Sequence, residues 1–322
     1  MPFRVVTAAV TAAAFMTASP VQAPSATAPR VQDAPAPPVI RYAGLGACAN
    51  DGGVGRHPCG PWRLWLSDGR VLALPDAHRT DGDHPAMGVM AVSPDGTRAA
   101  YLRGSDGALM IWEAATGKAR RTEVTKPDSV RITGLTVSPR GRFVGVEGEY
   151  ESRALFRDRV VDTATGKTFT LPRGYTLARF SPDDRHLMAT HRSGAVVYAT
   201  GTWSVKLRRS AYMTGDLGRD GVTVAKASRN DARPSGNRVT VRNLATGKKR
   251  AFPLRLRRGE APYRARWDAA GRLDVLTDSY RGPSGRESHT YTWYRLDRRT
   301  GRLRVLDSFV VTSAVGDVIL AG

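Results

Sequence analysis

The sequence predicts an all-β chain in which six copies of a four-stranded unit form a closed ring, a β-propeller. Two kinds of hairpin alternate along the chain, and together they recur about every 45 residues, which is the size of one propeller blade. No stretch keeps the 3.6-residue periodicity of an amphipathic helix. These observations favour strands and tight turns throughout.

The first hairpin places Pro, Asp or Gly between two runs that favour strands. It occurs as AVSPDGTRAAYL from Ala91, TVSPRGRFVGVE from Thr136 and RFSPDDRHLMAT from Arg179. Weaker copies are DLGRDGVTVAKA from Asp216 and RWDAAGRLDVLT from Arg266. Turn residues in this position are typical of a tight β-hairpin.

The second hairpin has a corner of the Thr-Gly or Asp-Gly type. ALMIWEAATGKARR from Ala108 and VTVRNLATGKKRAF from Val239 are examples. The spacings between successive corners are 48, 49, 35, 46 and 54 residues. The six corners predict six blades and lie at Gly69, Gly117, Gly166, Gly201, Gly247 and Gly301.

The two ends of the repeat complement each other. The corner at Gly69 has no turn motif before it, and the run SFVVTSAVGDVILAG from Ser308 has no corner after it. We therefore expect the C-terminal tail to complete the blade that begins near Val39. Such closure leaves no exposed sheet edge that could invite aggregation.

These blades resemble the WD-repeat-like blades of TolB-type propellers, over residues 40–322. The copy that carries the resemblance best is Ser93-Pro94-Asp95-Gly96 with Tyr101, Trp112 and Ala115-Thr116-Gly117. Blades five and six depart from it, because Gly218-Arg219-Asp220-Gly221 and Asp268-Ala269-Ala270-Gly271 replace the Ser-Pro pattern. With its arginine-rich composition, the chain is similar to secreted bacterial propellers of actinobacterial type. The resemblance implies the fold, whereas propellers of this kind serve many functions.

The first residues predict export. Residues 1–23 have the layout of a signal peptide: one early positive charge, an apolar run and a small-residue exit. That run is shorter than the roughly 20 residues of a transmembrane span. Residues 24–38 form a Pro/Ala-rich linker without expected structure, and residues 39–322 form the propeller. We expect a monomer without a transmembrane anchor, secreted or associated with the cell envelope.

Two cysteines, Cys48 and Cys59, lie in the first blade. An even number in an exported chain favours a disulfide, and two unpaired thiols are the alternative. His57 lies between them, but the spacing is a weak match to any zinc motif.

The charge of the chain is uneven. The formal net charge is +20, of which +4 falls on residues 1–160 and +16 on residues 161–322. A basic surface attracts polyanions, so a protein partner or an anionic envelope polymer is expected. Nucleic acid fits the charge, but the sequence shows no cluster of exposed aromatic residues for base stacking.

The repeat is longest and most basic in blades five and six, where the loop between the two hairpins of each blade lengthens. These loops and the connector between the blades predict one basic rim, because binding residues concentrate on loops held by a rigid scaffold. The candidate binding residues of the rim are Arg229, Arg233, Arg255, Arg257, Arg258, Arg264, Tyr280, Arg281, Arg286 and His289. Lys248, Lys249 and Arg250 at the adjoining corner are expected beside them.

Two clusters could carry chemistry. Imidazole and carboxylate groups that could bind a divalent ion lie between blades one and two, at Asp76, His78, Asp81, Asp83 and His84, but an ordinary polar loop is the favoured explanation. Glu147, Glu149 and Glu151 alternate along one strand, as paired glycosidase carboxylates could, and an exposed acidic turn beside Arg153 and Arg157 explains them equally well. No G-x-S-x-G elbow is present.

The sequence therefore predicts a non-enzymatic binding or scaffold module, with no catalytic residue, metal or cofactor assigned. The alternative is a hydrolase or lyase of the lactonase or glycan-active type, which would use the central channel. Trp112 and Trp293 lie in strands and are expected in the blade cores, while Trp203 lies in a corner where more exposure is expected.

Overall fold

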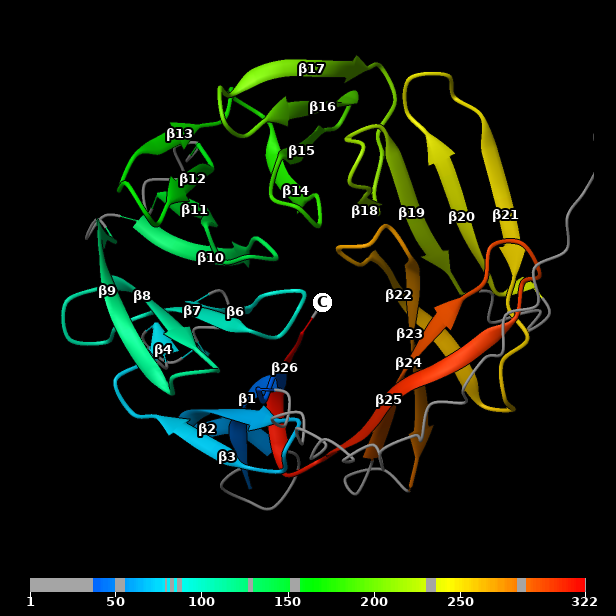
Figure 1. The fold of residues 1–322 in the computed structure, drawn as a ribbon. Coiled ribbons are helices and arrows are strands. Elements are labelled where there is room, and N and C mark those ends of the chain that lie inside the picture. The colour runs from blue at the N-terminus through cyan, green and yellow to red at the C-terminus, as the bar shows by residue number, and fades with distance from the viewer. Residues whose placement is uncertain are drawn as a thin grey trace, which may run out of the picture. The chain divides into compact units, whose positions relative to one another are not determined.

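The computed structural model describes residues 37–49, 56–78, 80–81, 84–85, 89–126, 130–150, 157–229, 236–282 and 288–321. Within these ranges the strands form six four-stranded antiparallel sheets and one two-stranded hairpin, and the sheets form the blades of a ring (Figure 1). The predicted signal peptide and the linker up to residue 36 lie outside the described residues. The six predicted blades are confirmed.

The blades follow one another in chain order, and the strands of each blade pair in the order in which they are named. Blade one consists of β26 (Val315–Leu320), β1 (Ile40–Ala49), β2 (Arg56–Leu66) and β3 (Val71–Leu74). Blade two consists of β6 (Met90–Val92), β7 (Arg98–Leu102), β8 (Ala108–Glu113) and β9 (Lys118–Thr125). Blade three consists of β10 (Val130–Val137), β11 (Phe143–Tyr150), β12 (Arg159–Asp162) and β13 (Thr168–Thr170).

Blade four consists of β14 (Thr176–Phe180), β15 (His186–His191), β16 (Gly194–Ala199) and β17 (Ser204–Arg209). Blade five consists of β18 (Asp216–Leu217), β19 (Thr223–Ser228), β20 (Arg238–Asn243) and β21 (Lys249–Pro253). Blade six consists of β22 (Glu260–Trp267), β23 (Leu273–Arg281), β24 (Ser288–Leu296) and β25 (Leu303–Thr312). The separate hairpin, β4 (Thr80–Asp81) with β5 (His84–Pro85), lies between blades one and two in the sequence.

The C-terminal tail closes the ring as predicted. β26 pairs antiparallel with β1, with Tyr42 opposite Leu320 and Gly46 opposite Val315. Tyr42 also packs in one cluster with Trp293 and Phe309 of blade six. The first and last parts of the chain therefore share one sheet, and the tail supplies the first strand of blade one.

The cores of the protein lie between the blades. The buried apolar residues fall into six clusters, and each cluster joins two neighbouring blades. β7 shows how this arises: Ala99 and Tyr101 pack toward blade one, while Ala100 and Leu102 pack toward blade three. Successive side chains of a strand point to opposite faces of the sheet, and in this strand both faces are buried. This explains why the middle strands are apolar without alternation.

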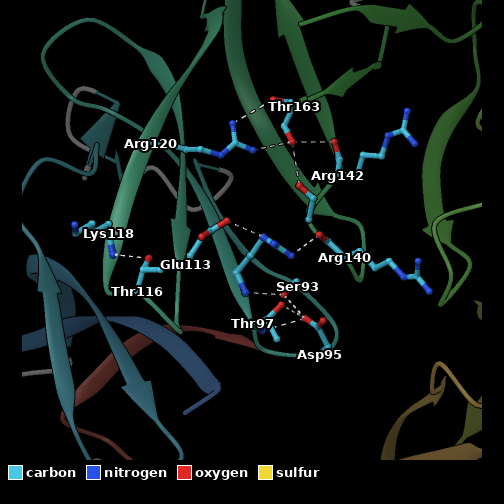
Figure 2. A network of polar contacts seen from close by, with 12 residues as sticks. Ser93, Asp95, Thr97, Glu113, Thr116, Lys118, Arg120, Arg140, Arg142 and Thr163 are labelled. Atoms are coloured by element: carbon cyan, nitrogen blue, oxygen red, sulfur yellow. Dashed lines mark hydrogen bonds and ion pairs between the residues drawn. The ribbon is translucent and has the colours of Figure 1, made fainter. Parts of the chain in front are cut away.

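The Ser-Pro turn motif is stabilised by its serine hydroxyl. Ser93 Oγ donates to Asp95 Oδ1 at 2.7 Å and accepts the backbone N–H of Arg98 at 3.0 Å, which closes the hairpin (Figure 2). Ser181 does the same in blade four, with Asp183 at 2.7 Å and the N–H of His186 at 2.9 Å. A short polar side chain that bonds its own backbone is what such turns favour.

Blade three has Arg140 in the place of the motif's aspartate, and its turn borrows a carboxylate from blade four. Ser138 Oγ donates to Asp184 Oδ2 at 2.8 Å, and the backbone N–H of Arg140 donates to Asp184 Oδ1 at 3.2 Å. Asp184 adopts a φ of 61°, which suits Asp and Gly better than other residues. The same turn receives a hydrogen bond from Arg98 of blade two, at the oxygen of Arg140 (Figure 2).

The corner of blade four differs from the sequence prediction. In the other Thr-Gly corners the glycine has a positive φ, for example 66° at Gly117, and its N–H closes the turn. In blade four Trp203, with a φ of 55°, takes this position two residues after Gly201, and its N–H donates to the oxygen of Ala199 at 2.7 Å. The indole stacks on Phe169 at 4.4 Å, which stabilises this backbone conformation and leaves Trp203 half-buried rather than exposed.

Several local predictions are confirmed. Cys48 and Cys59 form a disulfide with a Cα–Cα distance of 5.8 Å, across the paired strands β1 and β2. Trp112 and Trp293 are buried in the cores between the blades. The part of the chain that the structure describes contains no helix with the length and apolar character needed to span a bilayer.

Candidate functional site

The two faces of the ring carry different loops, because the strands of each blade alternate in direction. One face, here called the rim face, carries the ends of the second strands, the starts of the third strands and the connectors between blades, including 210–215 and 254–259. The opposite face, here called the turn face, carries the Ser-Pro turns and the corners. Lys248, Lys249 and Arg250 at the corner of blade five belong to the turn face, so the prediction that they adjoin the rim is wrong.

Several of the predicted rim residues are exposed on the rim face. Arg255, Arg257 and Arg258 are exposed on the connector 254–259, and Arg229 is exposed at the end of β19. The backbone N–H of Arg257 donates to Glu260 Oε2 at 3.2 Å, which orders the connector where it enters β22. Arg233 and Arg286 lie outside the described residues.

Three predicted loop residues of blade six lie in strands instead. Tyr280 and Arg281 end β23, His289 is the second residue of β24, and Tyr280 pairs with His289 across the ladder. The loop is shorter than predicted because this ladder continues to the pair Arg281–Ser288. Arg281 remains exposed and makes no salt bridge with the described residues, while His289 Nδ1 lies 3.0 Å from Asp278 Oδ1.

The sequence predicts Arg264 on the connector, but this residue lies within β22, inside the ring. Its Nη2 donates to Asp216 Oδ1 of β18 at 3.3 Å. Arg179 Nε of β14 donates to the same oxygen at 3.2 Å. The first strands of blades four, five and six are thus linked by one carboxylate, which accepts a hydrogen bond from each of two guanidinium groups.

These three residues form the floor of a pocket on the rim face, here called the mouth pocket. Its volume is about 340 Å³, within the range of small-ligand sites. Its wall combines hydroxyl groups, two exposed tyrosines and one lysine: Thr176, Thr190, Thr214, Tyr212, Tyr263 and Lys226. Arg179, Arg264 and Lys226 line the pocket, and Asp216 is the only carboxylate among the lining residues, so the lining carries an excess of positive charge.

The electrostatics of Arg264 follow from its burial. Burial lowers the pKa of Arg264, the negative charge of Asp216 raises it, and the positive charge of Arg179 lowers it, so that the net shift is downward. Its Nε atom is buried and hydrogen-bonds no group among the described residues. A buried donor without an acceptor costs about 1–3 kcal/mol, so an acceptor supplied by a ligand would stabilise the Arg264 side chain.

A row of aromatic rings connects the mouth pocket with the rim. Tyr263 meets Tyr291 with ring centroids 5.8 Å apart, Tyr291 stacks with His289 at 6.0 Å, and His289 meets Tyr280 at 5.5 Å. The two ends of the row are open, since Tyr263 is 57% and Tyr280 53% exposed. The row thus leads from an exposed tyrosine at the pocket to an exposed tyrosine at the end of β23 through the buried ring of Tyr291; the pocket, the row and the exposed rim arginines are together called the blade-six surface.

Arg179, Asp216 and Arg264 also border a second cavity that opens to the turn face. This channel pocket, about 170 Å³, is lined by all six first strands, from Met90 in β6 to Ile319 in β26. Pro94, Pro139 and Pro182 of the Ser-Pro turns make the wall of this pocket apolar on the side of the turn face. Arg266 donates to the backbone oxygen of Pro94 and so ties blade six to blade two near this wall.

A third cavity, here called the outer groove, lies between blades five and six on the turn face. Its volume is about 740 Å³, and five arginines line it: Arg250, Arg272, Arg295, Arg298 and Arg299. Most of these are engaged within the protein. Arg272 and Arg295 both pair with Asp268, at 2.7 and 3.1 Å, and Arg298 lies over the Trp267 ring at 5.1 Å.

Of the predicted carboxylate cluster, one member has an unusual environment. Burial, followed by the negative charge of Asp158, raises the pKa of Glu147 to about 7, although Arg179 opposes the shift. Burial also raises the pKa of Asp158 to about 6. Glu149 is exposed and pairs with Arg131 at 3.5 Å, and Glu151 lies outside the described residues.

The residues considered as metal ligands do not form a cluster that the structure describes. Asp76 accepts the Tyr101 hydroxyl at 3.2 Å, and Asp83 lies outside the described residues. No group of three or more His, Cys, Asp or Glu side chains that could hold a metal ion occurs in the described part of the chain.

Apart from Arg264, sequence reasoning missed the residues that form the mouth pocket. Asp216 begins the weak turn copy of blade five and was not singled out. Arg179 begins the turn motif of blade four and was interpreted as part of a hairpin, and Tyr212 and Tyr263 lie outside any recognised motif. One signal was available: charged residues stand in or directly before the turn copies of blades four to six, whereas blades two and three have Ala91 and Thr136 there.

No protein-family model matches the chain, and no curated protein matches it. Among solved structures, a putative TolB from Agrobacterium tumefaciens is similar, with 13% identity over 78% of this chain and 92% of that chain and a TM-score of 0.47. An acylaminoacyl peptidase from Pyrococcus horikoshii has 14% identity over 83% of this chain and 50% of the peptidase, with a TM-score of 0.43. A chain of a nidogen–laminin complex has 10% identity over 84% of this chain and 93% of that chain, with a TM-score of 0.43.

Proposed function

We propose that the protein is an exported, non-enzymatic binding module that recognises an anionic ligand through its blade-six surface. The ligand is an acidic protein segment or an anionic polymer of the cell envelope. The observation that carries the proposal is the excess of positively charged residues that line the mouth pocket, beside the aromatic row from Tyr263 to Tyr280 and the exposed rim arginines. Loops and strand ends on a rigid ring suit such recognition.

The charge distribution supports this proposal. Arg255, Arg258 and Arg281 are exposed and form no salt bridge with the described residues. A polyanion would meet these guanidinium groups without first displacing an internal carboxylate, and arginine forms two parallel hydrogen bonds with carboxylate or phosphate. The formal net charge of +20 adds long-range attraction that salt weakens.

Charge reversal on the rim tests the proposal. The triple variant R255E/R258E/R281E should lose at least about tenfold in affinity for anionic polymers. A hydrogen bond to a charged group contributes about 1.5–3 kcal/mol, and an exposed contact contributes less, so three lost contacts together account for this factor. Binding would be measured by fluorescence anisotropy at two salt concentrations with polyglutamate, polyphosphate and single-stranded DNA. The first two report recognition of carboxylate and phosphate, and the third reports base stacking.

The matched control is R299E/R302E/R304E, which makes the same charge change on blade six away from the rim. It should retain binding to within about twofold of the parent protein, apart from the general loss of positive charge. Equal loss in both variants would show that only the net charge attracts polyanions. Retained affinity in the rim variant would refute recognition by the blade-six surface.

A second candidate, a hydrolase that uses paired carboxylates, is supported by one observation. The raised pKa values of Glu147, about 7, and Asp158, about 6, are typical of a general acid with a neighbouring carboxylate. Hydrolysis of envelope glycans, assayed by the release of reducing ends, would have to be abolished by Glu147→Gln. Release that Glu147→Gln leaves unchanged would exclude this pair as its cause.

A further inference from the structure

We propose that the mouth pocket binds one oxyanion, a carboxylate or a phosphate group at the end of the ligand, and that Arg264 and Arg179 hold it. This inference rests on the proposed function and adds the chemistry of the group that enters the pocket. The remainder of the ligand would extend over the aromatic row toward Tyr280.

The hydrogen bonding of Arg264 is the first reason. A guanidinium group has five N–H donors. In Arg264, Nη2 is the nitrogen that donates to Asp216. Nε is buried without an acceptor among the described residues, and the side chain lines both the mouth pocket and the channel pocket. A small rotation of the guanidinium plane toward the mouth pocket would give these donors the two oxygens of an anion.

The charge balance is the second reason. Arg179 and Arg264 share the oxygen Oδ1 of Asp216, and Lys226 adds a third cation to the same pocket. The lining residues of this partly buried pocket count three cations against one carboxylate, and the nearby Glu147, whose pKa burial raises to about 7, offsets only part of this excess. Electrostatic attraction is stronger there than on the open surface, so one further oxyanion would be stabilised.

The shape and lining are the third reason. A volume of about 340 Å³ exceeds that of a bare ion and allows a group of one or two residues or one phosphorylated sugar. The hydroxyl of Thr214 can donate to an anion oxygen, whereas those of Thr176 and Thr190 bond each other at 3.3 Å and can accept from the ligand. Tyr212 and Tyr263 stand exposed at the same pocket.

Titration calorimetry on the purified propeller tests the site with small probes. N-acetylglycine supplies a carboxylate, inorganic phosphate supplies a phosphate, and N-acetylglycinamide is the neutral match of the first probe. We expect saturable binding of at least one anion and at least about tenfold weaker binding of the amide, a difference of about 1.4 kcal/mol. The stronger of the two anions identifies the ligand's end group.

Two variants place the binding in the pocket. Arg264→Gln should weaken the bound anion at least tenfold, and Lys226→Met, at an exposed position, should weaken it about threefold without disturbing the fold. Circular dichroism would verify that both variants are folded. No saturation up to about 50 mM probe, far above the roughly 1 mM dissociation constant of a weak site, would overturn the inference. The inference would also be overturned if N-acetylglycine and N-acetylglycinamide bound equally well. It would likewise be overturned if Lys226→Met and a folded Arg264→Gln both bound the anion as tightly as the parent protein.

The rim variant R255E/R258E/R281E separates this inference from the proposed function. If it loses polyanion binding while no small anion binds the parent protein, the blade-six surface recognises a polymer and the pocket inference fails alone. If small anions bind the parent protein and the rim variant keeps its affinity for polyanions, the pocket inference stands and recognition by the rim fails.

Discussion

The mouth pocket and the outer groove are both lined by arginines, but the two cavities differ in how many carboxylates and aromatic rings contact these arginines. In the outer groove, Arg295 pairs with Asp268 and with Asp274, and Arg298 stacks on an indole ring. In the mouth pocket, Asp216 alone serves Arg179 and Arg264, and one buried guanidinium nitrogen has no acceptor among the described residues.

The difference teaches that the number of arginines does not identify a binding site. Arginines that are neutralised by carboxylates or held on aromatic rings contribute to stability and have few donors left for a ligand. Arginines that exceed the nearby carboxylates, within a partly buried cavity, retain both donors and charge. The smaller cavity is therefore the better candidate, although the groove has twice its volume.

The largest expected effect comes from removing the shared carboxylate of each cavity. Asp216→Ala should lower the free energy of unfolding by about 3 kcal/mol, because it leaves Arg264 without its carboxylate in a partly buried site, whereas the more exposed Arg179 keeps its hydrogen bond to the oxygen of Ala178. Asp268→Ala should lower it by about 1–2 kcal/mol, since Arg272 is largely exposed and water replaces the lost contacts. Urea unfolding would measure both, and equal losses would contradict the distinction between the cavities.

The pH dependence of stability should differ between the two regions. The pKa of Glu147 is raised from 4.5 to about 7, so the folded state keeps a proton that the unfolded chain releases above about pH 4.5. Stability near the mouth pocket should therefore fall as the pH rises from about 5 to about 8, by about 2 kcal/mol. Burial favours a higher pKa for Asp268, but hydrogen bonds from Arg272 lower it, so the groove should lose stability only on acidification.

Urea unfolding of the parent protein and Glu147→Gln at about pH 5 and about pH 8 would measure this effect. The glutamine is neutral at both pH values, so the variant should lose most of the decrease between them. A decrease of the same size in Glu147→Gln would show that other groups cause it.

The smallest effect is expected on the ring-stacked arginine of the groove. Arg298→Ala should lower the free energy of unfolding by about 0.5–1 kcal/mol, because an exposed cation over an indole ring contributes about this much. Arg299→Ala removes a neighbouring arginine for which the described residues offer no such ring, and it should cost less than about 0.5 kcal/mol. Identical thermal unfolding of the two variants would indicate that the stacking contributes nothing.

The repeated turns made much of the fold predictable. Ser93 and Ser181 stabilise their turns through contacts within five residues, so the signal stays local and survives in sequence. Where a partner comes from another blade, local reading fails: Arg140 looks like a broken motif, and only the fold brings Asp184 to it. Trp203 replaces a corner glycine because Phe169 of blade three stacks on its ring, which no spacing rule indicates.

The candidate site was less predictable than the fold. Arg255, Arg257 and Arg258 form a charge run that predicts an exposed connector, and they are exposed there. The sequence places Arg264 on the same connector because Pro262 hides the start of β22, although the strand already begins at Glu260. It also predicts a longer loop in blade six because the strand pattern fades near Tyr280, where backbone pairing nevertheless continues.

By itself, the sequence predicted the number of blades, because turn chemistry acts over a few residues and repeats. It predicted the closure by the tail from the complementary half-units at the two ends, and the disulfide partners because the chain has two cysteines. The tertiary structure alone decided that Asp216 meets Arg179, 37 residues before it, and Arg264, 48 residues after it. Contacts across the channel depend on how all the blades pack side by side and on the register of each first strand. Those quantities are properties of the whole ring, and no short stretch of the chain encodes them.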